Sequence, residues 1–341
     1  MEEEYKYMVC TRCFTFNHAP YIVDAMNGFA MQETTFPVVT VIVDDASTDG
    51  EQDVIRKYLD EHFQEPYRTE ETDYAHIVCA NHKTNPNCQF IVLFMKFNHH
   101  SIRTPKTPYL KEWLDNAKYH ALCEGDDYWI DTQKLQMQVD ILQKNPNCSF
   151  CVTDYKEYNE YIKDFQPHQL KINKHIKDDY IYASIADYIY QGFFTKTLTA
   201  MYRPKALKQS NYYIYQLRYD MPMFYALFTQ GDCVFINKKM GVYRLSDAGV
   251  TSPIHREKFI DTQLPRLFSI IQVEKTKEAQ LFIYTFLKRY IVYVLYKHQF
   301  DIIRKCFSLF SLKLNMKLFL YELPKQVLII IKNKMQHKST D

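Results

Sequence analysis

The sequence predicts an α/β protein whose core is a mostly parallel sheet flanked by helices, and three observations lead to that fold class. Strand-like and helix-like segments alternate over the first third of the chain. The run FPVVTVIVDD (36–45) is a continuous β-branched stretch, which is typical of a strand covered on both faces. The 341 residues, 47% hydrophobic and 24% charged, can bury the core of one large α/β domain or of two small domains.

The first third is expected to form consecutive strand–helix units of βαβ type. Pro20 is tolerated in the first turn of the first helix, and Ser47 or Asp49 is placed to cap the second. In order, the expected elements are a strand over 5–16, a helix over 19–32, a strand over 36–45 and a helix over 49–63.

The rest of the chain is less regular. Residues 65–116 hold one plausible strand, 90–98, among Pro and Asn turns, so we expect an elaborated connection over one edge of the sheet. The later elements are expected as a strand over 119–123, a helix over 131–145, a strand over 148–158, a helix over 218–231, a strand over 232–244 and helices after 251.

Composition narrows the classes of partner and compartment. A net charge of +2 gives no reason to expect nucleic acid as a partner. The acidic start MEEEYKYMVC lacks the basic, apolar and small-residue regions that follow one another in a signal peptide, so a cytoplasmic protein is expected. The longest apolar run, LFIYTFLKRYIVYVLY, is interrupted by Lys288 and Arg289, which argues against a membrane-spanning helix.

The nine cysteines are expected to be reduced and mostly buried. Two CxxC pairs suggest zinc, Cys10 with Cys13 and Cys148 with Cys151, but both lie in segments that read as strands. Residues three apart on a strand point to opposite faces, so such a pair does not close easily on one ion. Buried structural thiols are therefore favoured.

Acidic pairs follow two of the predicted strands. Asp44 and Asp45 end the strand 36–45, and Asp126 and Asp127 follow the strand 119–123 in the stretch CEGDDYW. Ligands of open parallel sheets bind beyond the carboxyl ends of the strands, so the four carboxylates share one pocket if the two strands are neighbours. Carboxylates gathered in this way favour a hard cation, Mg²⁺ or Mn²⁺, that keeps positions open for phosphate oxygens.

Other acidic and phosphate-binding motifs fit less well. DDASTDGEQDVIR begins like a calcium loop, but its twelfth position is Arg56 and a strand precedes it instead of a helix. With seven glycines, the chain has neither a G-x-G-x-x-G nor a P-loop sequence. A bound diphosphate would therefore need a metal and cationic side chains.

The order of TFNHAPYI, VIVDDASTDG, CEGDDYWIDTQKLQMQVDIL, YDMPMFYALFTQGD and MGVYR resembles a family 2 glycosyltransferase of the GT-A fold, of the bacterial kind that builds surface polysaccharides. The resemblance covers roughly residues 7–250. It implies a nucleotide-sugar-binding half over 1–130, an acceptor-binding half over 131–250 and a helical, basic extension over 251–341.

The resemblance also assigns residues to the donor site. It implies that Asp127, with Asp126 toward the ribose, holds Mn²⁺ or Mg²⁺ at the diphosphate of a nucleotide-sugar, with a UDP-sugar as first candidate. The other donor-binding residues it implies are Thr15, Phe16, Asn17, Asp44, Asp45, Tyr243 and Arg244, of which Asp45 would hydrogen-bond the base edge and Arg244 would lie against the diphosphate. Phe16 replaces the family's more usual tyrosine, and LSDAGVTS lacks the histidine and paired glycines often found after VYR.

For the transfer itself, the resemblance implies that Asp220 is the general base that deprotonates the acceptor hydroxyl, with inversion at the anomeric carbon. Capping of a helix is the alternative for Asp220. Trp129 is a candidate for stacking on an acceptor sugar, with a core position as the alternative. The expected acceptor is a glycan or a lipid-linked molecule.

A sugar nucleotidyltransferase and a non-catalytic glycan-binding protein on the same scaffold are the alternative functions. The glycine-free segment CTRCFTFNHAP counts against the nucleotidyltransferase.

Residues 301–341 hold eight Lys or Arg against three Asp or Glu. A basic amphipathic tail of this kind can contact an anionic membrane, so peripheral contact with the inner face of the membrane is one expectation. The other is a helical cap with a solvated basic side.

Overall fold

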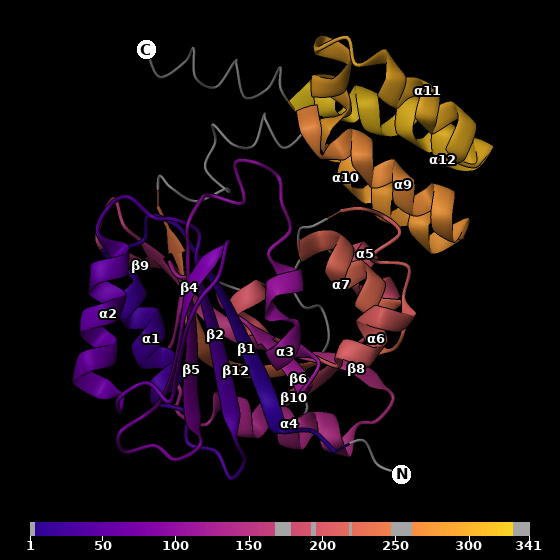
Figure 1. Cartoon of the computed structure of the whole chain (residues 1–341). Helices are drawn as coiled ribbons and strands as arrows, with labels where there is room; N and C mark the ends of the chain where they lie inside the picture. The colour runs from indigo at the N-terminus through magenta and orange to yellow at the C-terminus, as the bar shows by residue number, and fades with distance from the viewer. Residues whose placement is uncertain (1–3, 168–178, 192–195, 218–219, 247–260, 330–341) are drawn as a thin grey trace. The chain divides into compact units, whose positions relative to one another are not determined.

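The computed structural model describes residues 4–167, 179–191, 196–217, 220–246 and 261–329. It forms two compact units. Unit 1 contains the sheet with the helices α1 to α4 and α6, and unit 2 contains α5, α7 and the helices from α9 onward (Figure 1).

The sheet of unit 1 has a parallel centre, in agreement with the predicted α/β fold class. Its strands follow the order β10-β12-β8-β11-β6-β1-β2-β5-β4-β3. In the central part, β6, β1, β2 and β5 are mutually parallel neighbours. Their bounds are β1 (Tyr7–Thr15), β2 (Val38–Asp44), β5 (Cys88–Met95) and β6 (Ala117–Leu122).

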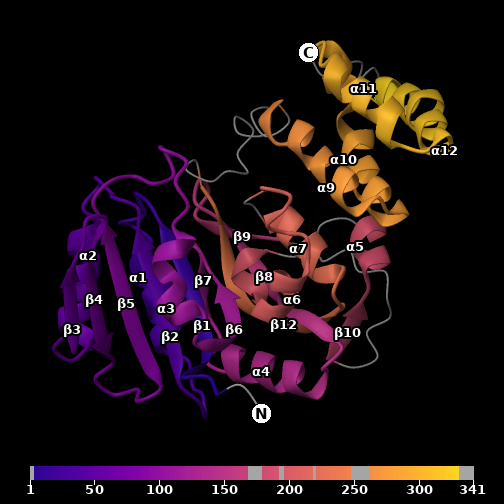
Figure 2. The same cartoon turned by 45° about the vertical axis from the view of Figure 1, so that its right-hand side comes forward.

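Helices cover both faces of this centre because alternate strand residues supply two apolar surfaces. Every residue of β2 is buried: Val38 and Ile42 face one core cluster, while Val39, Val41 and Val43 face the other. The first cluster includes residues of α1 (Ile22–Ala30), α2 (Glu51–His62) and α4 (Lys134–Lys144), and the second includes residues of η1 (Thr107–Leu110) and α3 (Lys111–Leu114). These helices can be followed beside the sheet in Figure 1 and Figure 2.

Antiparallel strands extend the sheet at both edges. The connection 65–116 contributes the hairpin β3 (Arg68–Glu71) and β4 (Ala75–Asn81), which pairs with β5. On the other side β11 (Ala200–Tyr202) joins β6 to β8 (Cys148–Asn159), which is parallel to β12 (Asp232–Leu245). The remaining short elements of unit 1 are β7 (Tyr128–Trp129), β9 (Asp164–Gln166), β10 (Tyr180–Ala183), η2 (Thr197–Thr199) and α6 (Pro204–Gln209).

The prediction of buried thiols is confirmed. All nine cysteines lie in the described residues, and all are free and buried. Cys10 and Cys13 belong to different core clusters, on opposite faces of the sheet, as the strand geometry of the CxxC pair requires.

Unit 2 is helical and includes the predicted C-terminal helices. Its bounds are α5 (Ile185–Gln191), α7 (Asp220–Phe228), α9 (Leu264–Glu274), α10 (Lys277–Tyr296), α11 (Phe300–Leu309), α12 (Leu312–Met316) and the π-helical segment η3 (Lys317–Glu322). Within the described residues, none of the helices has the length and apolar character needed to cross a membrane.

Candidate active site

The two acidic loops predicted from the sequence meet at the carboxyl end of β1. The two acidic strands are not neighbours, because β1 lies between them. β1 pairs in parallel with β2 on one side, where Thr15 is opposite Asp44, and with β6 on the other, where Arg12 is opposite Leu122. The loop after β2 and the loop after β6 therefore flank the end of β1, the position at which an open α/β sheet binds its ligands.

The loop after β6 approaches β1 so closely that it needs a glycine. The backbone N–H of Gly125 donates to Phe14 O at 3.1 Å. A Cβ at position 125 would lie 2.6 Å from Thr15 Cβ and closer still to Thr15 Oγ1. Gly125 thus brings the backbone that carries Asp126 and Asp127 against the last residue of β1.

The loops after β1 and β2 are joined by Glu51, a buried carboxylate at the start of α2. It accepts hydrogen bonds from the Thr15 hydroxyl, from the backbone N–H of His18 at 2.8 Å and from the Ser47 hydroxyl at 2.8 Å. Burial raises the pKa of Glu51. The sequence patterns of this segment, helix capping and an incomplete calcium loop, did not indicate Glu51.

Asn17 and Asp49 complete the connection between these loops. Asn17 has a left-handed backbone, with φ of 57°, and its side-chain oxygen accepts the Thr48 N–H at 2.8 Å. The predicted cap by Ser47 or Asp49 is wrong, because the N-cap of α2 is Gly50 in a left-handed conformation and no side chain of the described residues caps the helix. Asp49, one residue earlier, accepts the backbone N–H groups of Ala19 at 2.9 Å and of Glu51 at 3.1 Å. Phe16 is 40% exposed beside them, which leaves its ring open for stacking.

Asp44 and Asp45 are both buried but differ in their partners. Asp44 Oδ2 accepts from Gln52 Nε2 at 2.5 Å and from Ser47 N–H at 3.3 Å, whereas its Oδ1 has no hydrogen-bond partner in the described part of the chain. Burial raises the pKa of Asp44.

Asp45, by contrast, is fully engaged by the loop that follows β5. Its carboxylate accepts from the backbone N–H of His99 at 2.8 Å, from that of His100 at 3.0 Å and from Lys106 Nζ at 2.6 Å. These groups occupy the carboxylate that was expected to bind the edge of a base. Asp45 thus anchors the 98–106 loop, and its predicted role at the edge of the base stays a prediction.

Asp126 and Asp127 form the second carboxylate pair. Asp127 is 3% exposed, and its Oδ1 accepts the backbone N–H of Arg244 at 2.9 Å, which ties the loop to the end of β12. Burial raises the pKa of Asp127 well above its usual range, and the neighbouring Asp126 and Glu124 raise it further. Glu124 accepts the Thr197 hydroxyl at 2.6 Å.

The carboxylates of Asp126 and Asp127 fit a hard divalent cation that takes only some of its ligands from the protein. No group of three or more His, Cys, Asp or Glu side chains suited to a metal occurs among the residues that the structure describes. Asp126 and Asp127 supply two adjacent carboxylates, and their mutual repulsion is what a cation would relieve. Magnesium and manganese commonly use one or two carboxylates and complete their shell with water and phosphate oxygens.

The end of β12 carries the predicted residues Tyr243 and Arg244. The guanidinium of Arg244 is buried between Asp24 and Glu160, with Nη1 donating to Glu160 at 2.9 Å. Arg244 is thus paired with two carboxylates, and its predicted position beside a diphosphate stays a prediction. Its backbone, and not its side chain, reaches Asp127.

The side chain of Lys196, which no sequence pattern indicated, lies near the acidic loop. The charge of Lys196 lowers the pKa of Asp127, and its Nζ lies 3.7 Å from the centre of the Tyr243 ring. Lys196 comes from a region without a periodic pattern, so no sequence signal identified it.

The prediction for Trp129 is corrected by the structure. Trp129 is 2% exposed, its ring lies edge-on to Phe29 at 5.0 Å, and its Nε1 donates to Leu198 O at 2.8 Å. The side chain belongs to the core, because β7 pairs with β12 and turns it inward, so it cannot stack on an acceptor sugar.

Asp220 is the first residue of α7 in unit 2. It is half-buried, and its Oδ1 accepts the backbone N–H of Met221 at 2.9 Å. Its predicted role as the general base stays a prediction.

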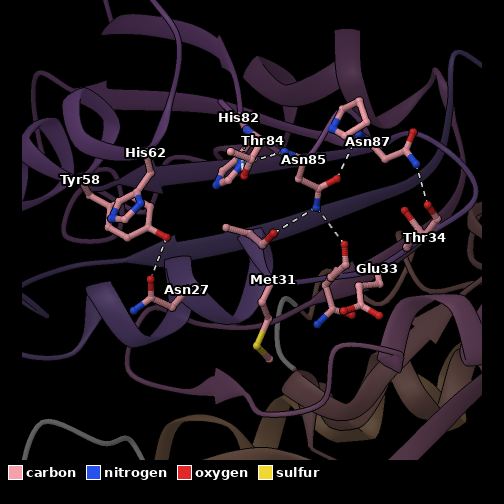
Figure 3. Close-up of a pocket in the computed structure, with 13 residues that line it drawn as sticks. Asn27, Met31, Glu33, Thr34, Tyr58, His62, His82, Thr84, Asn85 and Asn87 are labelled. Atoms are coloured by element: carbon pink, nitrogen blue, oxygen red, sulfur yellow. Dashed lines mark hydrogen bonds between the residues drawn. The ribbon is translucent and has the colours of Figure 1, made fainter.

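A pocket of about 700 Å³ lies at the opposite end of the sheet from the carboxylates. Figure 3 shows its lining from α1, α2 and the turn before β5, including Asn27, Tyr58, His62 and Asn85. The Asn85 side chain donates to Ala30 O and Gln32 O, at 3.1 and 2.9 Å, and so holds the turns together. The pocket therefore lies apart from the candidate active site.

Similarity to known proteins is limited in sequence and more extensive in fold. No protein-family model matches the chain. It is 33% identical over 141 residues to an uncharacterized protein of Mycobacterium tuberculosis and to one of Mycobacterium bovis, matches that cover 40% of this chain. The match spans 32% of the length of each of these curated relatives.

Among solved structures, the glycosyltransferase TarS of S. aureus is similar in fold. TarS 1–349 in complex with UDP-GlcNAc aligns with a TM-score of 0.53 at 16% identity, covering 82% of this chain and 72% of that chain. A second TarS structure aligns with a TM-score of 0.57 at 16% identity, covering 94% of this chain and 53% of that chain. The predicted GT-A fold with C-terminal helices is thereby confirmed.

Proposed function

We propose that this chain is an inverting, metal-dependent glycosyltransferase of family 2 that moves a sugar from a nucleotide-sugar to a hydroxyl of a glycan or lipid-linked acceptor in surface polysaccharide synthesis. A UDP-sugar is the first candidate donor. The observation that carries the proposal is the pair Asp126 and Asp127, which lies against the end of β1 with Asp127 buried and its pKa raised. TarS, which shares the fold, binds UDP-GlcNAc.

In this proposal the carboxyl ends of β1 and β2 bind the nucleoside. The exposed ring of Phe16 stacks on the base, and Thr15, Asn17 and Asp44 shape the surrounding wall. Asp44 lies behind this wall, because it is buried, and its Oδ1 has no hydrogen-bond partner among the described residues. Tyr243 and Lys196 lie on the diphosphate side, near Asp127.

Asp126 and Asp127 would hold Mn²⁺ or Mg²⁺. When bound, the cation neutralises the charge that develops on the leaving nucleoside diphosphate. The chain's own contribution is to hold the two carboxylates still: Arg244 donates its backbone N–H to Asp127, and Gly125 lets the loop pack on Thr15.

Asp220 is proposed as the general base. It would accept the proton of the acceptor hydroxyl while the new C–O bond forms and the bond to the nucleoside diphosphate breaks, and a single attack from the opposite face inverts the anomeric carbon. A lipid-linked acceptor would place the reaction at a membrane, consistent with the proposed peripheral contact of residues 301–341 with its inner face.

Calorimetry on the full chain tests the donor site. We expect UDP to bind more tightly with Mn²⁺ than with EDTA, and GDP and CDP to bind more weakly than UDP. Asp127→Asn should lose the Mn²⁺ effect, whereas Asp60→Asn, an exposed control on α2, should keep it. Metal-independent binding in the wild-type chain would refute the metal part of the proposal, and the absence of nucleotide binding would refute the whole.

The chemistry needs its own assay. A screen of nucleotide-sugars for release of nucleoside diphosphate should identify one donor that turns over. Formation of a nucleotide-sugar from a nucleoside triphosphate and a sugar phosphate would favour the nucleotidyltransferase reading, and donor binding with no turnover would favour the binding protein.

A helix-capping role for Asp220 makes a different prediction from catalysis. Asp220→Asn should keep donor affinity and lose transfer by at least about 100-fold if Asp220 is the base. Asp301→Asn, which alters another first-turn aspartate in unit 2, should leave transfer intact. Equal transfer by the two variants would remove Asp220 from the mechanism.

A further inference from the structure

The helical stretch 312–329 in unit 2 presents two different sides. It consists of α12, the π-helical segment η3 and a helical segment over 323–329. Leu314, Leu318 and Glu322 are buried against the rest of the unit, and Glu322 accepts a hydrogen bond from the Tyr284 hydroxyl of α10 at 3.3 Å. One side of the stretch is therefore fixed to its helical neighbours.

Two rows of exposed residues run along the rest of the stretch, and the second of them borders the fixed side, because Lys317 Nζ lies 5.6 Å from the centre of the Tyr284 ring. The apolar row consists of Leu312, Met316, Leu320 and Leu328, which are between 52 and 78% exposed. The lysine row consists of Lys313, Lys317 and Lys325, each of them exposed. Its first two members directly follow residues of the apolar row in the sequence, and its third lies between the last two residues of that row.

The π-helical segment helps to keep these rows on one side. In an α-helix of 3.6 residues per turn, side chains four positions apart drift around the axis. The wider turns of η3, with their i→i+5 hydrogen bonds, reverse part of that drift between Lys317 and Glu322. Residues spaced by four thus stay exposed over the whole stretch while Leu314 and Leu318 stay buried.

We propose that the apolar row and the lysine row form a surface that lies on an anionic membrane. Apolar side chains grouped beside lysines are the pattern of helices that rest in the membrane interface, with the apolar residues inserted and the cations at the headgroups. A membrane satisfies both rows at once. A second copy of the same surface would bring lysine row against lysine row, which is unfavourable. The inference rests on the peripheral membrane contact proposed above for residues 301–341, which it assigns to these two rows, and it does not depend on the transfer reaction.

Vesicle flotation with the full chain tests this surface. We expect flotation with vesicles of phosphatidylcholine and phosphatidylglycerol and much less with phosphatidylcholine alone. Each lysine near an anionic surface strengthens binding about fivefold. The triple variant Lys313→Gln/Lys317→Gln/Lys325→Gln should therefore weaken partition by about 100-fold.

Matched variants distinguish membrane binding at this surface from a general effect of charge. Leu312→Ser/Leu320→Ser should weaken binding at least about tenfold with the charge unchanged. The control Lys111→Gln/Lys144→Gln/Lys205→Gln alters three exposed lysines of unit 1 and should float like the wild type. All variants change exposed side chains, and circular dichroism checks that they fold.

Two results would overturn the inference. The first is that the triple lysine variant floats as well as the wild type, or that neither protein floats. The second is a wild-type oligomer, measured by sedimentation equilibrium, that Leu312→Ser/Leu320→Ser dissociates while no form of the chain floats. That second result would make the surface an interface between copies of the chain.

Discussion

Replacing Gly125 with alanine tests whether the close approach of the acidic loop to β1 builds the site. The added Cβ would lie 2.6 Å from Thr15 Cβ, where ordinary contact begins at 3.4 Å, so the backbones must separate by about 0.8 Å, and the overlap with Thr15 Oγ1 demands more. Thr15 is buried and hydrogen-bonded to Glu51, so it cannot simply rotate away. Overpacking of this kind costs about 1–3 kcal/mol of unfolding free energy.

The displacement should affect binding more than stability, because Asp126 and Asp127 move with the loop. A misplacement near 1 Å can cost about 100-fold in turnover, and we expect at least a tenfold loss of Mn²⁺-dependent UDP affinity by calorimetry. Gly231→Ala is the matched control: its Cβ would lie 2.5 Å from Asn147 O, at the opposite end of β12 from Arg244. It should lower stability in urea unfolding by a similar amount and leave UDP affinity unchanged. Wild-type UDP affinity in Gly125→Ala, or an equal loss in Gly231→Ala, would show that the close approach does not position the carboxylates.

Three further predictions concern buried titratable groups. Asp127→Asn should raise the melting temperature of the metal-free protein at pH 8. Folding raises the pKa of Asp127, so the wild type loses stability as the pH rises above the pKa of this group in the unfolded chain. Added Mn²⁺ should no longer shift the melting temperature of the variant. Glu51→Gln replaces an acceptor oxygen with a donor and should cost about 1–3 kcal/mol in urea unfolding; an unchanged midpoint would contradict the hydrogen bonds to Thr15 and its neighbours. Burial lowers the pKa of His120 from 6.5 to about 4, so the wild type should lose about 3 kcal/mol between pH 7 and pH 4 as the unfolded chain takes up the proton, and His120→Gln should lose that much less.

The centre of the fold could be predicted from the sequence because its elements have strong local patterns. The run 36–45 became β2, buried along its whole length, and the helical spacing over 131–145 became α4. The acidic pairs could be located for the same reason: each directly follows an apolar strand. Their meeting on either side of β1 depends on strand order, which the sequence pattern did not contain.

The parts that sequence reasoning missed depend on contacts between distant residues. The strand β3 has the sequence RTEE, which carries no apolar alternation, and it forms because β4 pairs with it. Glu51 resembles an ordinary first-turn acid until the fold places Thr15 and His18 beside it. Trp129 follows the acidic motif directly, yet its pairing with Gly241 of β12 directs it into the core.

The buried carboxylates connect the stability of unit 1 with the chemistry proposed for it. Burial raises the pKa of Asp44, Glu51 and Asp127, so the charged form of each is less favourable in the folded protein than in water. Hydrogen bonds from three groups offset this cost at Glu51, and Gln52 with the Ser47 N–H offsets part of it at Asp44. Within the described residues Asp127 accepts a hydrogen bond only from Arg244 N–H. Asp127 is therefore the carboxylate whose charge a bound cation would stabilise most, and for this reason its replacement by asparagine separates stability from binding.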